Sequence, residues 1–293
     1  MQLSLKTFFG TILFCLITVS GLAQEAEFNE TIRVGGSTTL LPVIADCASQ
    51  YMEKYSTWDK VDPSLPKKQV LIFVTGGGSG FGVNSAINGT VDIGMSSRDL
   101  KEGEKTKLGA HKECLVSKDC VAFAVKKDNP LATLDNLTAA DIVKIYSGEA
   151  KTYQDVRPNL PAKPILILMR DMAGGSTEMV QQLILKDKTF SSQAIQVPSQ
   201  GANLKKVEGN SSAITYISSV LALESDKLKV FNFEGVEPTN ENVVNGKYPI
   251  TRPLILVVKD KPSLTEQKFI DFILNEGQSI VAEHGYVPVK KVR

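Results

Sequence analysis

Short continuous apolar runs alternate with segments in which apolar residues recur at helical spacing along most of the chain. The runs are typical of buried β-strands and predict strands at residues 31–34, 69–74, 91–94, 121–125, 164–169 and 253–258. The periodic segments predict helices at residues 41–55, 83–88, 138–146, 177–185 and 264–274. Strands that alternate with helices predict an α/β fold with mainly parallel sheets and helices on both faces.

The first 23 residues have the layout of a secretory signal peptide. A single positive charge, Lys6, precedes an apolar run at residues 8–22, and small residues precede a cleavage point after Ala23. The run is about 15 residues long, short for a membrane span, and an uncleaved N-terminal anchor is the alternative. Phe14 before Cys15 argues against a bacterial lipid anchor, which needs a small residue there. We therefore expect a protein that is exported to the periplasm.

The composition is that of a globular chain of 293 residues, with 42% hydrophobic and 22% charged residues. That length suffices for one large domain or two ordinary ones. The 33 basic residues balance the 32 acidic ones, so nucleic-acid binding, which requires a basic excess, is not expected. Two histidines and four cysteines leave little material for a zinc centre, and neither a metal nor another cofactor is expected.

Three cysteines remain in the exported chain. Cys114 and Cys120 are close enough in the sequence to close a small loop by a disulfide in an oxidising compartment. Buried thiols are the alternative for this pair. Cys47 lies on an apolar helix face and is expected in the core. The odd count leaves at least one thiol unpaired.

Three strand–helix junctions carry glycines followed by small hydroxyl residues. They are GGSTT at 35–39, GGGSG at 76–80 and RDMAGGST at 170–177. Glycine lets the backbone approach a ligand closely, and the helix start that follows presents unpaired N–H groups and a partial positive charge. Hydroxyls and the permanent charge of Arg170 add donors that match a tetrahedral oxyanion. Because crevice ligands bind at the carboxyl ends of strands in open α/β sheets, the turns predict an anion site.

Motifs of common phosphate-handling enzymes are missing from the sequence. There is no G-x-x-x-x-G-K-[ST] loop, and Phe81 takes the second glycine position of a nucleophile elbow. Neither His111 nor His284 has a serine or cysteine partner by motif. The sequence therefore favours binding over catalysis, and the alternative is an exported hydrolase that uses Ser79 or Ser176 as its nucleophile.

The order of these motifs resembles a known family. The segments are GGSTTLLPV (35–43), VTGGGSGFGVNSAINGTVDIGMSSRDL (74–100), MRDMAGGST (169–177), SAITYI (212–217) and GKYPITRPLILVV (246–258). In this order they are similar to the periplasmic phosphate-binding proteins of ABC phosphate transporters, over nearly the whole mature chain. The resemblance implies a type II periplasmic-binding-protein fold, in which two α/β lobes are joined by two hinge strands with a ligand cleft between them.

The resemblance also implies where the chain divides. The expected parts are a signal peptide at 1–23, lobe 1 at 24–118 and 254–293, and lobe 2 at 119–253. The two crossings between the lobes are then expected near residues 120–125 and 250–254. In that arrangement the Cys114–Cys120 pair would lie beside a hinge.

The turns and the resemblance together give a set of expected phosphate contacts. They are Ser37, Thr38, Thr39, Ser79, Gly80, Ser97, Arg98, Arg170, Gly174, Gly175 and Ser176. In two places the chain departs from the family pattern: the aspartate that accepts the proton of hydrogen phosphate falls on Ser97, and a loop serine falls on Gly174. Losing the carboxylate removes the group that repels sulfate. Arg98 and Asp99 are candidates to enter the site instead, and Asp171 is a candidate to orient Arg170.

The resemblance implies a monomeric extracytoplasmic binding protein that captures inorganic phosphate between its lobes and delivers it to the membrane permease of an ABC transporter. No bond is made or broken in such a cycle, so no catalytic residue is expected. Alternatives are another tetrahedral oxyanion (sulfate, molybdate, tungstate or arsenate), the hydrolase named above, and an adhesion or scavenging protein without a transporter.

Overall fold

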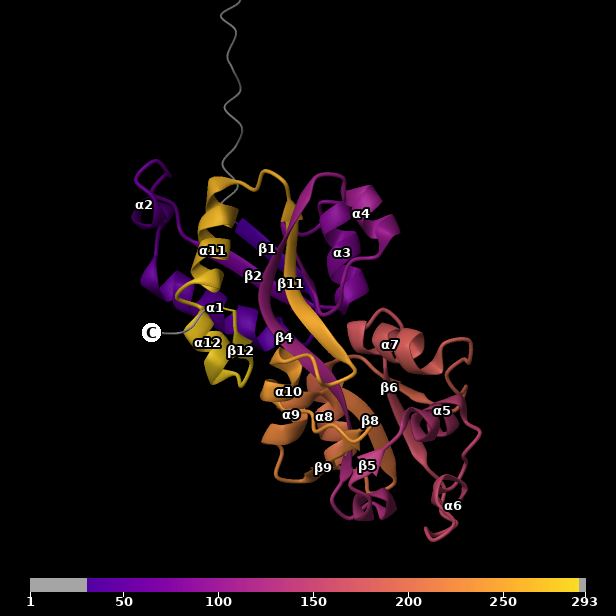
Figure 1. The fold of residues 1–293 in the computed structure, drawn as a ribbon. Helices are drawn as coiled ribbons and strands as arrows, with labels where there is room; N and C mark the ends of the chain where they lie inside the picture. The colour runs from indigo at the N-terminus through magenta and orange to yellow at the C-terminus, as the bar shows by residue number, and fades with distance from the viewer. Residues whose placement is uncertain (1–30, 290–293) are drawn as a thin grey trace, which may run out of the picture.

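The computed structural model describes residues 31–289. The predicted signal peptide and its cleavage point lie outside the described residues. Within the described range, no helix is both long enough and apolar enough to span a bilayer. The chain forms two lobes, one above the other in Figure 1, and a single sheet continues through both of them.

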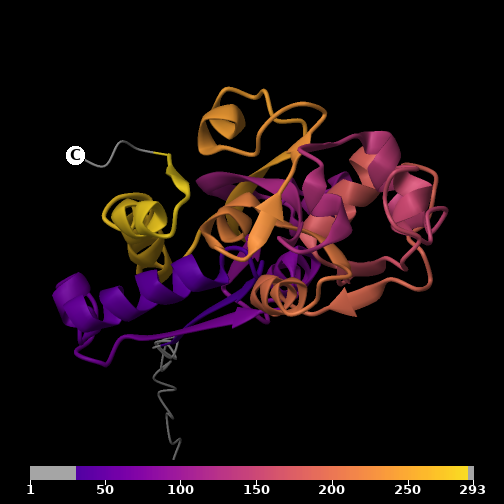
Figure 2. The ribbon, with the colours of Figure 1, turned by 90° about the horizontal axis from the view of Figure 1, so that it is seen from below.

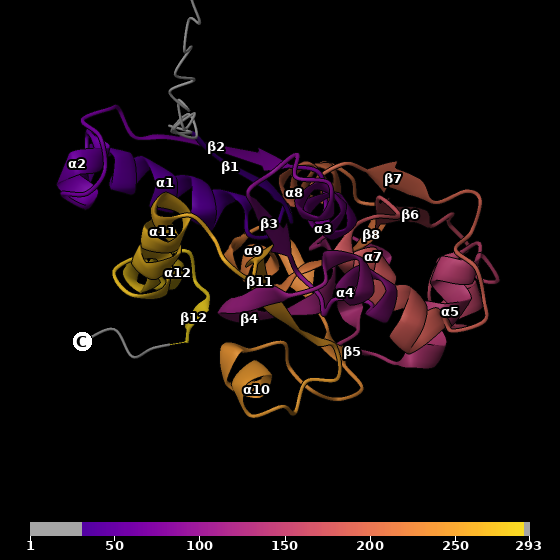
Figure 3. The ribbon, with the colours of Figure 1, turned by 90° about the horizontal axis from the view of Figure 1, so that it is seen from above.

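The first lobe combines the N-terminal third of the chain with its C-terminal end. Its strands are β1 (Thr31–Gly36), β2 (Leu71–Gly76), β3 (Ile93–Ser96), β11 (Thr251–Lys259) and β12 (Val287–Pro288). Its helices are α1 (Leu41–Lys54), α2 (Trp58–Val61), α3 (Ser79–Ile87), α4 (Glu102–Leu108), α11 (Leu264–Leu274) and α12 (Gln278–Glu283). Helices α1, α11 and α12 lie on one face of the sheet, and α3 and α4 lie on the other (Figures 1 and 3).

The second lobe is built from the middle of the chain. Its strands are β5 (Asn136–Leu137), β6 (Leu166–Arg170), β7 (Ile195–Val197), β8 (Ala213–Ser218), β9 (Leu228–Val230) and β10 (Asn232–Phe233). Its α-helices are α5 (Ala139–Ser147), α6 (Tyr153–Val156), α7 (Gly175–Val180), α8 (Gln200–Glu208), α9 (Ser219–Glu224) and α10 (Asn240–Val244). A 3₁₀ turn, η1 (Pro130–Thr133), and a π-helical turn, η2 (Gln181–Leu185), complete the lobe.

Strand β4 (His111–Lys126) passes from one lobe into the other. It pairs with β11 as far as Cys120 and with β8 from Val121 onward, both antiparallel. The order of the sheet is β2-β1-β3-β11-β4-β8-β6-β7. The sheet is therefore mixed rather than mainly parallel: pairing is parallel among β2, β1 and β3 and among β8, β6 and β7, and antiparallel where the lobes join.

Of the two possibilities for Cys114 and Cys120, the structure does not form the disulfide. Both residues belong to β4, and all three described cysteines are free. Six residues of extended chain span roughly 20 Å, whereas a disulfide needs its two Cα atoms within about 7 Å. The alternative holds for Cys120, which is fully buried, and Cys47 lies in the core as expected.

Each lobe has its own main apolar core. The first packs helix α1 and helix α11 against the sheet around Ile32, Tyr51 and Phe269. The second surrounds Phe123 and Tyr216. Figure 2 shows α1 lying alongside the two C-terminal helices, far from α5 and α7. Because each lobe buries its own core, the lobes can move relative to one another without exposing it.

Most predicted elements form, with shifted ends. The helix predicted at 264–274 is confirmed residue for residue as α11. The helix predicted at 83–88 begins at Ser79, because Gly78 has a φ of 86° and makes the turn that lets the helix start earlier. The helix predicted at 177–185 starts at Gly175 and changes to π geometry at Gln181.

Candidate functional site

The three glycine and hydroxyl turns meet in one cavity between the lobes. The cavity has a volume of about 10 Å³ and is lined by Ser37, Thr38, Thr39, Gly78, Ser79, Ser97, Arg170, Gly174, Gly175, Ser176 and Gln200. The turns follow the carboxyl ends of β1, β2 and β6, and Ser97 follows β3. The structure thus brings together nine of the eleven expected contacts.

Backbone hydrogen bonds tie the first turn to β3 and to the second turn. The Ser37 N–H donates to the Met95 carbonyl at 2.9 Å, and the Gly78 N–H donates to the Gly36 carbonyl at 3.0 Å. Gly36 has a φ of 139°, and a Cβ atom there would lie 2.2 Å from the Met95 carbonyl oxygen. Only glycine fits at this position, where the end of β1 pairs with β3, and the chain that follows places Thr38 and Thr39 at the cavity wall.

Arg170 brings a positive charge from the second lobe. Its side chain is almost completely buried, and it donates to the Val197 carbonyl at 2.6 Å and to Thr38 Oγ1 at 3.1 Å. Burial lowers the pKa of the guanidinium, and the carboxylate of Asp171, 2.8 Å away, opposes that change. Arginine stays charged at neutral pH, so this wall of the cavity is cationic.

The third turn closes the cavity against the first lobe. A Cβ atom on Gly175 would lie 2.7 Å from both Ser79 Oγ and Ser97 Oγ. The Gly80 N–H donates to the Ala173 carbonyl at 3.0 Å. The two lobes therefore touch directly at the cavity, and the structure is a closed form.

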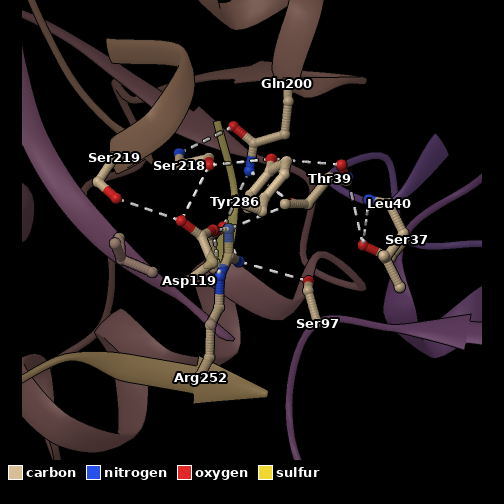
Figure 4. A network of polar contacts seen from close by, with 12 residues as sticks. Ser37, Thr39, Leu40, Ser97, Asp119, Gln200, Ser218, Ser219, Arg252 and Tyr286 are labelled. Carbon is tan, nitrogen blue, oxygen red and sulfur yellow. Dashed lines mark hydrogen bonds and ion pairs between the residues drawn. The ribbon is translucent and has the colours of Figure 1, made fainter. Parts of the chain in front are cut away.

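Arg252 is a site residue that the sequence analysis missed. It lies on β11 and its side chain is 0% exposed. It donates to Ser176 Oγ at 2.6 Å, and to Thr39 Oγ1 at 3.2 Å and Ser97 Oγ at 3.3 Å (Figure 4). It therefore reaches the segments that follow β1, β3 and β6. Nε and Nη2 both donate to Asp119 Oδ2, at 3.0 and 2.6 Å.

Asp119 is fully buried and holds Arg252 in place from the neighbouring strand β4. Its second carboxylate oxygen accepts hydrogen bonds from Ser218 Oγ at 3.0 Å and Ser219 Oγ at 3.3 Å. Both oxygens of the Asp119 carboxylate are therefore occupied by these partners, away from the cavity (Figure 4). A charged pair inside an apolar strand segment, the Asp before Cys120 and the Arg in TRPLILVV, was the sequence signal that could have revealed them.

Gln200, the first residue of α8, was also missed. Its Nε2 donates to Ser176 Oγ at 3.1 Å and to Thr39 Oγ1 at 3.3 Å, and its Oε1 accepts from the Ser218 N–H at 3.4 Å. A glutamine at the start of a helix belongs to no recognisable motif, so nothing in the sequence signals it. Only the packing of α8 against β8 brings it to the cavity.

Two expected contacts do not face the cavity. Arg98 donates to both carboxylate oxygens of Glu104 at 2.8 Å and forms an ion pair with Glu178 at 2.8 Å. Its charge is therefore neutralised by these two carboxylates at the rim of the cleft. Gly80 has its N–H bonded to the Ala173 carbonyl. These two expectations are corrected. Asp99 is exposed, whereas Asp171 pairs with Arg170.

The cavity is chemically a set of hydrogen-bond donors. The described residues that line it include hydroxyls, an amide and a guanidinium, and include no histidine, aspartate or glutamate. No cluster of metal-binding side chains occurs among residues 31–289. Such a wall suits a small oxyanion, since every oxygen of the anion is an acceptor.

Comparisons with known proteins agree with this chemistry. The profile of a family described as "PBP superfamily domain" matches residues 23–276. The phosphate-binding protein PstS of Borreliella burgdorferi is 29% identical over 294 residues, which cover 95% of this chain and 98% of that protein. The Staphylococcus epidermidis (strain RP62A) PstS is 28% identical, with 92% of this chain and 82% of that protein covered.

Solved structures give the same result. A putative phosphate ABC transporter substrate-binding protein from Clostridium perfringens, determined with bound phosphate, is 30% identical and superposes with a TM-score of 0.75 over 89% of this chain and 100% of that one. PstS from Borrelia burgdorferi is 27% identical with a TM-score of 0.57, over 90% of this chain and 100% of that one. The expected type II periplasmic-binding-protein fold is confirmed.

Proposed function

The chain belongs to the PBP superfamily, and from that premise we propose that it captures inorganic phosphate in the cavity between its lobes and passes it to the membrane permease of an ABC transporter. The observation that carries the proposal is the cavity itself, whose lining combines Arg170 with hydroxyls from the ends of four strands. Arg252 lies behind this lining and donates to Ser176, Thr39 and Ser97. The relatives and the Clostridium perfringens structure support phosphate as the anion.

Binding without turnover fits the same wall. A serine nucleophile needs a general base within hydrogen-bond reach. His111 bonds to the Gly109 carbonyl, and His284 pairs with Asp46. Neither histidine is among the described residues that line the cavity with Ser79 and Ser176. The hydrolase alternative therefore gains no support.

The cycle that we propose follows from the closed form. The anion is bound by the hydroxyls of Thr38, Ser79 and Ser97 from the first lobe. Arg170 and the Gly175–Ser176 turn bind it from the second lobe. Closure is favoured because it brings both sets of donors to one ligand. The movement would bend β4 and β11, with lobe 1 at 24–118 and 254–293 and lobe 2 at 119–253.

Location and assembly belong to the same proposal. The signal-peptide layout of residues 1–23 supports export to the periplasm, where a binding protein meets its permease. We propose a monomer that acts alone until it docks on the permease.

The experiment that tests the ligand is calorimetric titration of the mature protein, stripped of carried-over ligand by partial unfolding. Phosphate should bind one to one, and excess sulfate should not displace it completely. Absence of phosphate binding, together with tight binding of sulfate or molybdate, would overturn phosphate as the ligand while leaving an oxyanion site.

Arg170→Ala tests the site. We expect phosphate affinity to fall at least about tenfold, because a charge-assisted hydrogen bond contributes about 1.5–3 kcal/mol. Lys186→Ala, a charge deletion outside the described cavity lining, is the matched control and should leave affinity unchanged. An Arg170→Ala variant that folds and binds phosphate like the control would remove Arg170 from the site.

A further inference from the structure

The hydroxyl groups of the cavity differ in how many of their lone pairs are already occupied. A hydroxyl has one hydrogen to donate and two lone pairs that accept. A neighbour that can only donate, such as a guanidinium or a backbone N–H, occupies a lone pair and leaves the hydrogen of that hydroxyl for the ligand. Counting these neighbours therefore tells which corners of the cavity can accept a hydrogen from a ligand.

Three hydroxyls have both lone pairs occupied. Ser37 Oγ accepts from the N–H groups of Thr39 at 3.2 Å and Leu40 at 3.4 Å. Ser176 Oγ and Thr39 Oγ1 each accept from both Arg252 and Gln200, at distances between 2.6 and 3.3 Å. These three hydroxyls can only donate to a ligand.

The pair formed by Ser79 and Ser97 is different. Their hydroxyl oxygens lie 3.1 Å apart; Ser79 Oγ also accepts from the Ser97 N–H at 2.9 Å, and Ser97 Oγ accepts from Arg252 at 3.3 Å. One more lone pair and one hydrogen are used in the bond between the two hydroxyls. The pair therefore offers one free lone pair and one free hydrogen, so this corner can both accept and donate.

Thr38 Oγ1 also keeps one lone pair, but its surroundings differ. It accepts from Arg170 at 3.1 Å, and Arg170 itself lines the cavity. A ligand oxygen beside that guanidinium is favoured in its deprotonated form. A protonated ligand oxygen is therefore directed away from Thr38 and toward the two serines.

We propose that the Ser79–Ser97 pair is the part of the cavity that accepts the hydrogen of hydrogen phosphate, and that Arg252 and Gln200 are positioning residues that hold the other hydroxyls as donors. The proposal rests on the proposed function. Near neutral pH, phosphate carries at least one P–OH group and sulfate carries no hydrogen. The corner distinguishes the two anions modestly, since the same hydroxyls can turn and donate to sulfate.

A double-mutant cycle tests the proposal. After Ser79→Ala or Ser97→Ala alone, the remaining serine still has one free lone pair and one hydrogen, so each single variant should lose only about threefold in phosphate affinity. The double variant leaves the P–OH without an acceptor and should lose at least about tenfold more than the two single losses combined. Sulfate, titrated in parallel, should show no such excess loss.

The control is Ser176→Ala, which removes a hydroxyl that only donates. It should weaken phosphate and sulfate by similar factors. Additive losses for phosphate in the Ser79/Ser97 cycle, or equal excess losses for both anions, would overturn the acceptor role. Each variant is first checked for the wild-type circular-dichroism spectrum. If the double variant does not fold, the single variants test the proposal, because a tenfold loss of phosphate affinity in either one contradicts the lone-pair count. Failure of the wild-type protein to bind phosphate contradicts the proposed function instead.

Discussion

Two arginines that the chain buries almost completely, Arg252 and Arg98, differ in what is left of their hydrogen-bonding capacity. Arg252 shares one carboxylate oxygen of Asp119 between two of its nitrogens and directs its remaining donors to Ser176, Thr39 and Ser97. Arg98, at the rim, has two carboxylates and a backbone carbonyl around it. The first supports the lining hydroxyls of the cavity, and the second belongs to the contact between the lobes.

The difference teaches that a buried arginine near a cleft is not by itself an anion contact. The sequence analysis named Arg98 as a candidate to enter the site where the family aspartate is missing. The carboxylates of Glu104 and Glu178 outnumber its charge and leave nothing for an anion. Arg252 has a single carboxylate partner, so its excess donors can orient the hydroxyls that meet the ligand.

The sharpest test of the inner cluster is Asp119→Asn. Removing one partner of a fully buried ion pair leaves the other charge uncompensated, and we expect a loss of about 3–5 kcal/mol in the free energy of unfolding, measured by urea denaturation without ligand. Glu104→Gln at the rim should cost less, because Glu178 still pairs with Arg98. The comparison breaks down if the two variants lose the same amount.

The fit between the lobes is tested by Gly175→Ala. Its new Cβ would lie 2.7 Å from two serine oxygens, so full closure is prevented, and overpacking of this kind costs about 1–3 kcal/mol. Phosphate affinity should fall about tenfold by calorimetry. Gly201→Ala in α8, where a Cβ would meet nothing within 4 Å, is the matched control and should bind as wild type does.

The rim cluster is tested by Glu178→Gln. Glu178 lies on α7 and pairs with Arg98 at 2.8 Å and Lys101 at 2.7 Å, which belong to the other lobe. Losing these pairs should speed phosphate release about threefold, because Arg98 keeps its ion pair with Glu104 and the pair with the exposed Lys101 contributes only about 0.2–1 kcal/mol. Glu102→Gln removes a pair within α4 only and should change nothing. An unchanged release rate for Glu178→Gln in stopped-flow measurements would mean that the rim does not hold the lobes closed.

The smallest effect is a dependence on acid. Burial raises the pKa of Glu104, but hydrogen bonds from Arg98 and from the Lys101 N–H outweigh it, and the pKa lies below its usual value. Because the folded-state pKa is the lower one, the stability that Glu104 contributes is present above about pH 4.3 and is lost as the pH falls through the folded-state pKa. Glu104→Gln should flatten this part of the acid unfolding curve, and an unchanged curve would contradict the assignment.

Local chemistry was readable in the sequence because it depends on near neighbours. A glycine turn after an apolar run predicts where a strand ends and a helix begins, and the three turns and Arg170 all reach the cavity. The position of α11 followed from its periodic apolar face, and the structure shows that Ser263 caps it. The disulfide failed because proximity in sequence says nothing about spacing along an extended strand.

The α/β class, the three glycine and hydroxyl turns and the resemblance that points to phosphate were readable from the sequence alone, because these depend on residues close together in the chain. The tertiary structure decided which charges face the cavity. Thr39 and Arg252 are 213 positions apart and meet only through the β11 crossing, and Arg98 is removed from the site by Glu178 from the opposite lobe. Such contacts depend on how strands and helices pack in space, which no local pattern encodes.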